Sequence, residues 1–128
     1  MKFFAGLFTL LVALLHFAIM AVEMFFWDAP IGLRVFNMTA EAAASSQVMA
    51  FNQGFYNGIL AVGLMWGLLA SNHGVKIFFL LAIIGAGIVG GLSVKMTIVY
   101  VQALPAFIAL IFVMKSKGRK AGEQRLFS

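Results

Sequence analysis

A histidine and a glutamate lie inside the first apolar stretch of this sequence, where ionisable side chains are rare. His16 and Glu23 are seven residues apart, so on a helix they share one face, about two turns from each other. An imidazole and a carboxyl group can each accept and release a proton, as a general base and a general acid do. We therefore treat His16 and Glu23 as the candidate catalytic acid/base pair.

Amide and aromatic side chains form a second polar group. Asn52 and Tyr56 are one helical turn apart, as are Gln53 and Asn57, so together they form a polar helix face about 140° wide. The residues that we expect to bind a ligand are Trp27, Asn52, Gln53, Tyr56, Asn57 and Gln102. Side chains of this kind can hydrogen-bond one polar group of a bound molecule.

Each of these residues also has a structural interpretation. Asn and Gln side chains in membrane helices often hydrogen-bond to a neighbouring helix, which explains Gln53 equally well. Glu23 and Lys95 could form an ion pair that clamps two helices together, in place of acid/base chemistry. His73, the other histidine, falls on the opposite side of the membrane from His16 in the topology below, and cysteine is absent. We therefore predict no metal site and no cofactor.

The composition indicates an integral membrane protein. The chain has 128 residues, of which 63% are hydrophobic and 10% are charged. A soluble domain carries roughly 25% charged residues, and a chain this short has too little interior to bury so much apolar surface. The formal net charge is +5, but five of the nine basic residues follow Met114. Such a basic tail favours contact with anionic lipid headgroups over binding to nucleic acid.

Four stretches are long and apolar enough to cross the hydrocarbon layer, so we predict one all-α domain, an up-down bundle of four transmembrane helices over residues 1–114. The predicted spans are about 3–27, 48–70, 75–94 and 96–114, with an outer loop at 28–47 and a basic cytoplasmic tail at 115–128. Within the loop, Thr39 is a candidate cap for a short helix lying on or dipping into the membrane interface. At about 1.5 Å rise per residue, the polar side chains of the first, second and fourth spans all fall in the outer half of the bilayer.

Basic residues predict the orientation of these spans. With four crossings, both termini and the 71–76 turn lie on one side, together with Lys2, Lys76 and the basic tail. The other side carries only Arg34 and Lys95. The positive-inside rule therefore places both termini in the cytoplasm of a multi-pass protein in the bacterial inner (plasma) membrane.

Small residues recur at four-residue spacing on the second and third spans and predict close helix packing. The pairs are Gly54/Gly58, Gly63/Gly67, Ala86/Gly90 and Gly87/Gly91. On the fourth span, Pro105 follows Gln102 closely and predicts a kink that frees backbone carbonyl groups near the polar residues.

Four segments carry a resemblance to a known family: "LHFAIMAVEMFFW", "NQGFYNGILAVGL", "GAGIVGGL" and "VQALPAFIAL". In this order and spacing the chain resembles, over roughly residues 3–115, the small bacterial and fungal membrane proteins grouped as domain of unknown function 1304. The resemblance implies four transmembrane helices. The positions that it marks are His16, Glu23, Trp27, Asn52, Gln53, Gly54, Tyr56, Asn57, Gln102 and Pro105. Ala103 departs from the glycine usual there, which concerns packing, and the resemblance supplies no reaction.

The leading hypothesis from these observations is a polar pocket in the outer half of the bundle that binds a small amphipathic or lipophilic molecule. His16 and Glu23 could add acid/base chemistry to that pocket, so whether the protein is an enzyme stays open. The first alternative is a small-solute carrier, proton-coupled or passive, that works as a homodimer among membrane lipids. The second is a structural or accessory subunit in which the polar cluster only holds the helices in register.

Overall fold

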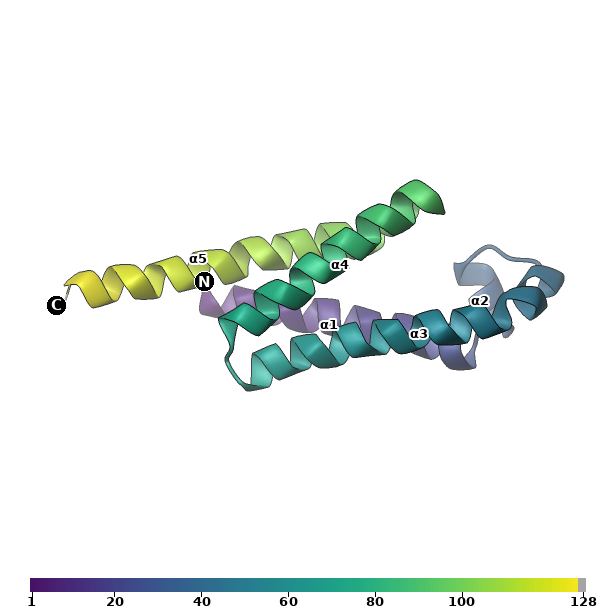
Figure 1. The fold of residues 1–128 in the computed structure, drawn as a ribbon, viewed down its shortest axis with the longest axis horizontal. Coiled ribbons are helices and arrows are strands. Elements are labelled where there is room, and N and C mark those ends of the chain that lie inside the picture. The colour runs from purple at the N-terminus through teal and green to yellow at the C-terminus, as the bar shows by residue number, and fades with distance from the viewer. Residues whose placement is uncertain (127–128) are drawn as a thin grey trace. The chain divides into compact units, whose positions relative to one another are not determined.

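The computed structural model describes the backbone of residues 1–126 and the side chains of residues 1–116. It is all-α, as predicted, with no strand among the residues described. The elements are α1 (Lys2–Phe25), α2 (Pro30–Val35), α3 (Ala40–Leu69), α4 (His73–Ser93), the π-helix η1 (Val99–Ala103) and α5 (Leu104–Leu126) (Figure 1). They form two compact units: residues 14–61, and residues 1–13 together with the chain from residue 62 onward. We call these the 14–61 unit and the terminal unit.

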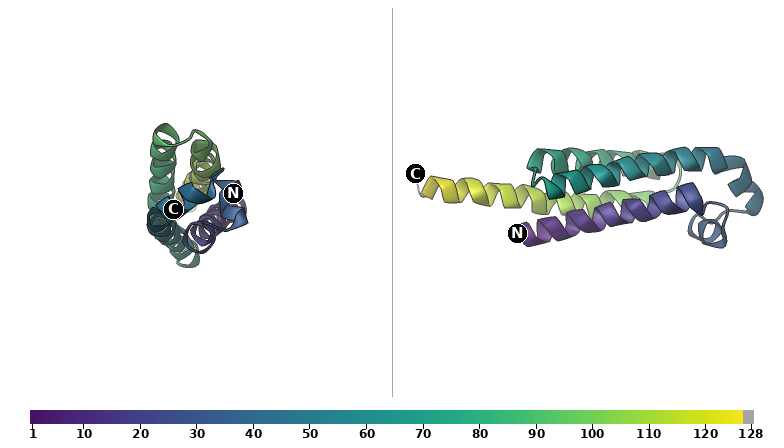
Figure 2. Two further views of the ribbon diagram at one scale, coloured as in Figure 1. Left: turned by 90° about the vertical axis from the view of Figure 1, so that its right-hand side faces the viewer. Right: turned by 90° about the horizontal axis from the view of Figure 1, so that it is seen from below.

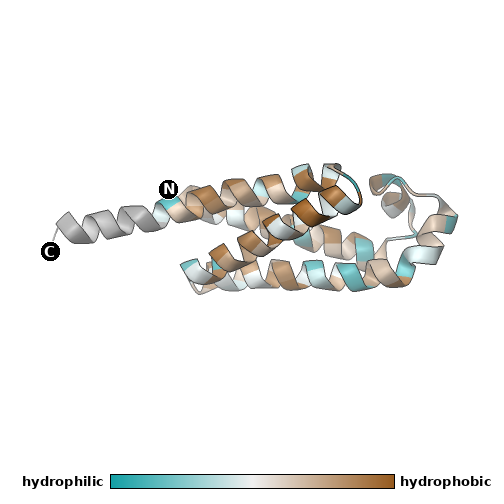
Figure 3. Ribbon diagram, turned by 45° about the horizontal axis from the view of Figure 1, so that its top comes forward, coloured by the Kyte–Doolittle hydropathy of each residue, from teal (hydrophilic) through white to brown (hydrophobic). Residues whose placement is uncertain are grey.

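Among the described residues, three helical segments are long and apolar enough to cross a membrane: Lys2–Phe25, His73–Ser93 and Val99–Ser116. They correspond to the first, third and fourth predicted spans. The second predicted span, about 48–70, lies in the 30-residue helix α3 except for its last residue, and α3 is not one of the three. Hydrophilic bands interrupt α3 along its length (Figure 3). The amide side chains of Asn52, Gln53 and Asn57 lower the mean hydropathy of the predicted span, which is otherwise apolar and long enough to cross a membrane.

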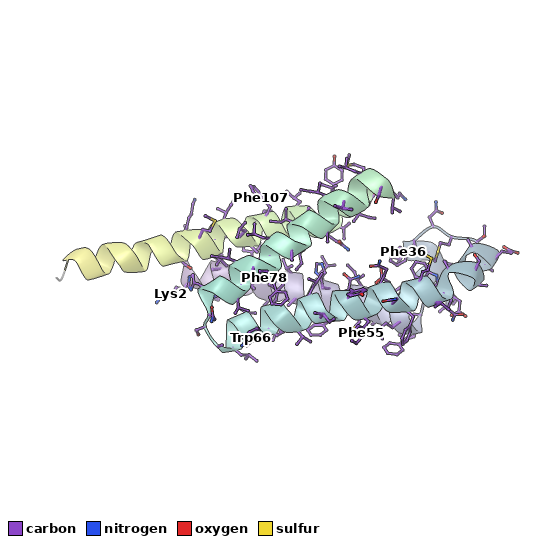
Figure 4. All side chains as sticks on the ribbon, in the orientation of Figure 1. Lys2, Phe36, Phe55, Trp66, Phe78 and Phe107 are labelled. Atoms are coloured by element: carbon purple, nitrogen blue, oxygen red, sulfur yellow. The ribbon has the colours of Figure 1, made fainter. Side chains whose placement is uncertain are left out.

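The pattern of burial supports a membrane environment. Large apolar side chains lie exposed along the helices, including Phe55, Trp66, Phe78 and Phe107 (Figure 4). The buried positions are mostly small, with alanine the commonest residue among the buried apolar ones. Small residues let helices approach closely where lipid provides no hydrophobic drive for association, whereas the large apolar residues can face the lipid tails.

Much of the predicted outer loop at 28–47 is helical, and the short helix expected there begins at Pro30 rather than after Thr39. α2 begins with Pro30 in its first turn, where the absent N–H breaks no hydrogen bond. After α2, Asn37 adopts a positive φ of 51° that reverses the chain. Thr39 then caps the long helix α3, since its hydroxyl Oγ1 accepts the Ala42 N–H at 3.1 Å. α2 therefore lies at the end of α1, where the chain turns back into α3 (Figure 2).

Helix α3 starts eight residues before the predicted boundary at residue 48, at Ala40. The intervening segment "AEAAASSQ" contains four alanines and a glutamate, which have high helix propensity. A segment that is too polar for the hydrocarbon layer can still be helical, so hydropathy set the predicted boundary too late.

In the terminal unit, glycines of α4 pack against the turn of π-helix. A Cβ atom on Gly87 would lie 2.9 Å from the Cβ of Ala103, and one on Gly91 would meet the Val99 side chain. The predicted Gly87/Gly91 pair therefore marks a close contact between α4 and η1. Ala86 of the other predicted pair is exposed. The basic tail predicted at 115–128 continues helix α5 to Leu126, and its side chains beyond residue 116 lie outside the described residues.

Candidate functional site

The side chains of Glu23 and Asn57 meet inside the 14–61 unit and join α1 to α3. The Nδ2 atom of Asn57 donates to Glu23 Oε2 at 2.8 Å and to the backbone oxygen of Gln53 at 3.2 Å. Both hydrogens of the Asn57 amide are therefore used. Asn57 is buried and Glu23 is partly buried. In the part of the chain that the structure describes, this is the one hydrogen bond recorded for the Glu23 carboxyl group.

Two glycines of α3 allow this contact. A Cβ atom on Gly54 would lie 2.6 Å from Met24 Cγ, 3.0 Å from Glu23 Cβ and 3.1 Å from the Met20 backbone oxygen. A Cβ atom on Gly58 would lie 2.6 Å from Met20 Sδ. The predicted Gly54/Gly58 pair thus lets α1 approach α3 at the level of Glu23, close enough for a short asparagine side chain to reach the carboxyl group.

His16 lies on the same face of α1 as Glu23, two turns nearer the N-terminus. Its side chain is fully buried, with 0% relative exposure. Along a helix axis, seven residues span about 10.5 Å. This separation is greater than a direct hydrogen bond can cover. Chemistry that uses both residues therefore needs a molecule between them. Met20 occupies the intermediate turn and packs against Gly58.

The predicted polar face of α3 is divided between two environments. Asn57 points into the contact with α1, whereas the side chains of Asn52, Gln53 and Tyr56 are exposed. The packed face of α3 is instead made of small residues one turn apart, among them Ala50, Gly54 and Ala61. The proposed ligand-binding role of the three exposed side chains stays a prediction.

Trp27 already has partners within the 14–61 unit. Its indole Nε1–H donates to Ser46 Oγ at 3.0 Å, and its ring packs against the Phe36 ring with centroids 4.7 Å apart. Gly32 of α2 packs against the backbone oxygens of Phe26 and Trp27, where any side chain would clash. These contacts hold α2 between the end of α1 and the start of α3.

Lys95 and Gln102 belong to the terminal unit. Lys95 is exposed in the turn after α4, and Gln102 is partly buried within η1. The ion pair between Glu23 and Lys95 therefore stays a prediction, as does a pocket shared with Gln102. Pro105 was expected to kink this span. The structure has a turn of π-helix just before Pro105, in which the Leu104 N–H donates to the Val99 oxygen. Because proline lacks an N–H, it cannot continue the regular hydrogen-bond pattern, and π-turns are frequent at functional sites.

Three buried polar residues among those described were not predicted as site residues. Thr9 is fully buried on α1, Lys76 is buried on α4 beside Gly67, and Ser116 is buried on α5. Ser116 Oγ donates to the Val113 oxygen at 2.8 Å and contacts His73 Nε2 at 3.0 Å. A signal existed only for Thr9, which precedes His16 by the same seven residues that separate His16 from Glu23. Among the described side chains, no three His, Asp or Glu residues gather as a metal site would require.

Comparison with known proteins identifies a family and a relative. The family described as "Protein of unknown function (DUF1304)" matches residues 10–114. The chain is 36% identical over 107 residues to "Uncharacterized protein YpaA" of Lactococcus lactis subsp. lactis (strain IL1403), a match that covers 80% of this chain and 90% of that protein. No solved structure matches the chain.

Proposed function

Because the chain belongs to the DUF1304 family, whose description assigns no activity, we propose its function from the geometry around Glu23. The protein binds a small amphipathic or lipophilic molecule within the membrane. The Glu23 carboxyl group and its neighbours on α3 hold the polar group of this molecule, while its apolar part contacts apolar side chains and lipid.

The observation that supports this proposal is the incomplete hydrogen bonding of Glu23. An ionised carboxylate can accept about four hydrogen bonds, and a protonated carboxyl group can donate one and accept others. The residues described here supply one, from Asn57. Since ionisable side chains in a membrane span are costly, they usually serve a function. A ligand hydroxyl or amino group placed on the carboxyl group would fill its remaining capacity.

The exposed polar side chains of α3 suggest how such a ligand is recognised. Asn52, Gln53 and Tyr56 precede Asn57 by at most five residues, so they lie within about 8 Å of it along the helix axis. Their exposure makes two amides and a phenol available to a molecule that arrives along the bilayer. A ligand with one polar end could therefore move from these groups to Glu23 without entering water.

His16 extends the proposal to catalysis. With Glu23 about 10.5 Å from His16 along α1, a substrate held between them can lose a proton to one residue and receive a proton from the other at a second atom. No atom is gained or lost in such an isomerisation, and a final proton exchange restores both side chains. General acid/base catalysis of this kind needs no cofactor.

We place this site in a four-helix arrangement in which α3 crosses the membrane with the part after about residue 48. Both termini then face the cytoplasm, and the protein crosses the inner (plasma) membrane four times. The distribution of basic residues supports this orientation, because Lys2, Lys76 and Lys115 fall on one side and Arg34 and Lys95 on the other.

Native mass spectrometry of the full-length protein, released from mild detergent, tests ligand binding. We expect a bound small molecule that survives purification with the wild type and is lost in Glu23→Gln. The glutamine can still accept a hydrogen bond from Asn57, so the fold should persist. Glu41→Gln is the matched control, because Glu41 is exposed at the start of α3.

A wild-type protein that carries no molecule, or an adduct unchanged in Glu23→Gln, would contradict the proposal. If Glu23→Gln and Lys95→Met both lower the thermal unfolding temperature in detergent equally, Glu23 is instead one half of a structural clamp. Solute uptake into liposomes that disappears in His16→Ala would favour the carrier.

A further inference from the structure

The π-turn before Pro105 deprives one backbone oxygen of its usual hydrogen-bond donor. In an α-helix, the carbonyl oxygen of Tyr100 would accept the N–H of the residue four positions on, Leu104. Here the Leu104 N–H donates to the Val99 oxygen. In a π-helix, the Tyr100 oxygen would accept the N–H five positions on, but that residue is Pro105, which has none. The Tyr100 oxygen therefore lacks a backbone donor in the described helix.

The side chains around this position do not replace the missing donor. Residues 103–108, which follow on the same helix, are all apolar. Residues 80–92 of α4, which pack against η1 through glycines, are also apolar or glycine. Gln102 is two residues on from Tyr100, which places it about half a turn around the helix. No side chain within the described part of the chain is recorded as a donor to the Tyr100 oxygen.

The Tyr100 oxygen lies on the exposed side of its helix. A helical carbonyl group points along the axis toward the residue four positions on, so this oxygen lies between the side chains of Tyr100 and Leu104. Those side chains are 64% and 48% exposed, whereas Ala103, which packs against Gly87 of α4, is 6% exposed. The oxygen is therefore accessible to a molecule outside the helix pair.

Exposed apolar side chains continue this side of the helix. They recur every three or four residues and so form one face of α5. We call these residues the apolar strip: Leu104, Phe107, Ile111 and Met114. Tyr100 is the second residue of the candidate membrane span Val99–Ser116, so its oxygen lies near one end of that span. From Tyr100 to Met114 the helix rises about 21 Å, which exceeds the hydrocarbon thickness of one leaflet, about 15 Å.

We propose that the Tyr100 carbonyl oxygen binds the hydroxyl group of a membrane amphiphile whose hydrocarbon chain lies on the apolar strip. A carbonyl group without a donor is costly in hydrocarbon, and a hydroxyl group satisfies it without adding a charge. Fully ionised anionic groups have no hydrogen to donate, and a metal cation needs several oxygen ligands. Water can donate as well, but it gains nothing from the apolar strip. A long-chain alcohol or a diacylglycerol has the required chemistry.

This site goes beyond the proposed function and shares no residue with it. Tyr100, Pro105 and the apolar strip belong to the terminal unit, whereas Glu23 and its neighbours belong to the 14–61 unit. Binding at the Tyr100 oxygen requires no carboxyl group, so Glu23→Gln should leave it unchanged. The two proposals can therefore fail independently.

Photolabelling of the full-length protein in lipid nanodiscs tests the site. The probe is hexadecanol with a diazirine group in its chain, and its methyl ether is the control, because the ether keeps the chain and the oxygen but cannot donate. Mass spectrometry of the digested protein locates the labelled residues. We expect the alcohol to label the apolar strip about two- to tenfold more than the ether does, as one net hydrogen bond predicts.

Pro105→Ala gives the sharper test. Alanine supplies the missing N–H and allows the regular hydrogen-bond pattern to resume, so the preference for the alcohol over the ether should disappear. Because alanine favours helix, this loss would not come from unfolding. Pro30→Ala is the matched control, since the proline in the first turn of α2 breaks no hydrogen bond. Equal labelling of the wild type by alcohol and ether would overturn the proposal, and so would a preference that persists in Pro105→Ala.

Discussion

At the scale of single residues, the proposed function depends on a few polar side chains that are costly to place in an apolar medium. Glu23 and Asn57 partly satisfy one another at 2.8 Å. His16 and Thr9 are buried completely. A hydrogen bond contributes little net stability in water, but a buried polar group left without a partner loses its full solvation. Removal of one partner is therefore the most informative change at this scale.

Asn57→Leu should destabilise the protein because it leaves the Glu23 carboxyl group without its amide donor. We expect a loss of about 1–3 kcal/mol, seen as a lower thermal unfolding temperature in detergent. Asn52→Leu makes the same substitution at an exposed position of the same helix and should change stability by no more than about 0.5 kcal/mol. Equal effects of the two substitutions would show that the bond between Asn57 and Glu23 contributes nothing specific.

The sequence predicted part of this residue chemistry. Spacing placed His16 and Glu23 on one face of a helix, and depth placed Asn57 with the other polar side chains in the outer half of the bilayer. It did not predict that Asn57 alone turns inward while Asn52, Gln53 and Tyr56 are exposed. Which polar side chains of a helix become buried depends on the face that a second helix covers, and the spacing within one helix does not show this.

At the scale of helices, glycines decide which faces meet. Gly54→Ala would place a Cβ atom 2.6 Å from Met24 Cγ and 3.1 Å from the Met20 backbone oxygen. Because backbone cannot move aside as a side chain can, we expect α1 and α3 to separate locally and the contact between Glu23 and Asn57 to weaken. Overpacking of this kind costs about 1–3 kcal/mol.

Thermal unfolding in detergent measures this effect, and ligand retention by native mass spectrometry should fall with it. Gly85→Ala serves as the control, since a Cβ atom on Gly85 has nothing within 4 Å. Should Gly54→Ala be as stable as Gly85→Ala, the close approach of α1 and α3 would not be required.

The boundaries of the helices were predicted less well than their existence. Hydropathy located the apolar stretches, but the alanine-rich start of α3 and the short helix α2 lie outside them. Helix propensity, Pro30 in the first turn of α2 and the cap at Thr39 extend helical structure past the apolar limit. Pro105, which lacks an N–H, explains why the regular hydrogen-bond pattern is disturbed here. The sequence did not predict that the Leu104 N–H would donate to the Val99 oxygen.

At the scale of the whole molecule, the number of membrane crossings decides the orientation of every loop. Four crossings place Asp28 and Thr97 outside and Gly74 inside. If α3 does not cross, Gly74 lies on the outside with Asp28, and Thr97 lies inside. The chain contains no cysteine, so single-cysteine variants at these three positions can distinguish the two topologies.

Labelling of spheroplasts with a membrane-impermeant maleimide is the measurement. We expect Asp28→Cys and Thr97→Cys to react before lysis and Gly74→Cys to react only after lysis, because the basic residues favour four crossings. The converse pattern for Gly74→Cys and Thr97→Cys would establish three crossings and remove α3 from the membrane. All three positions are exposed, so each should react after lysis.

The sequence by itself indicated a membrane environment and predicted that the apolar stretches are helical. Apolar content, the length of the apolar stretches and the spacing of His16 and Glu23 are properties of the chain that neighbouring helices do not alter. Only the tertiary structure decided which partner each polar group has: Asn57 for Glu23, Ser46 for Trp27, and none among the described residues for the Thr9 hydroxyl. The reason is physical. Membrane solvation is set by composition, whereas a hydrogen bond between two helices exists only where small residues bring their backbones close enough for the side chains to meet.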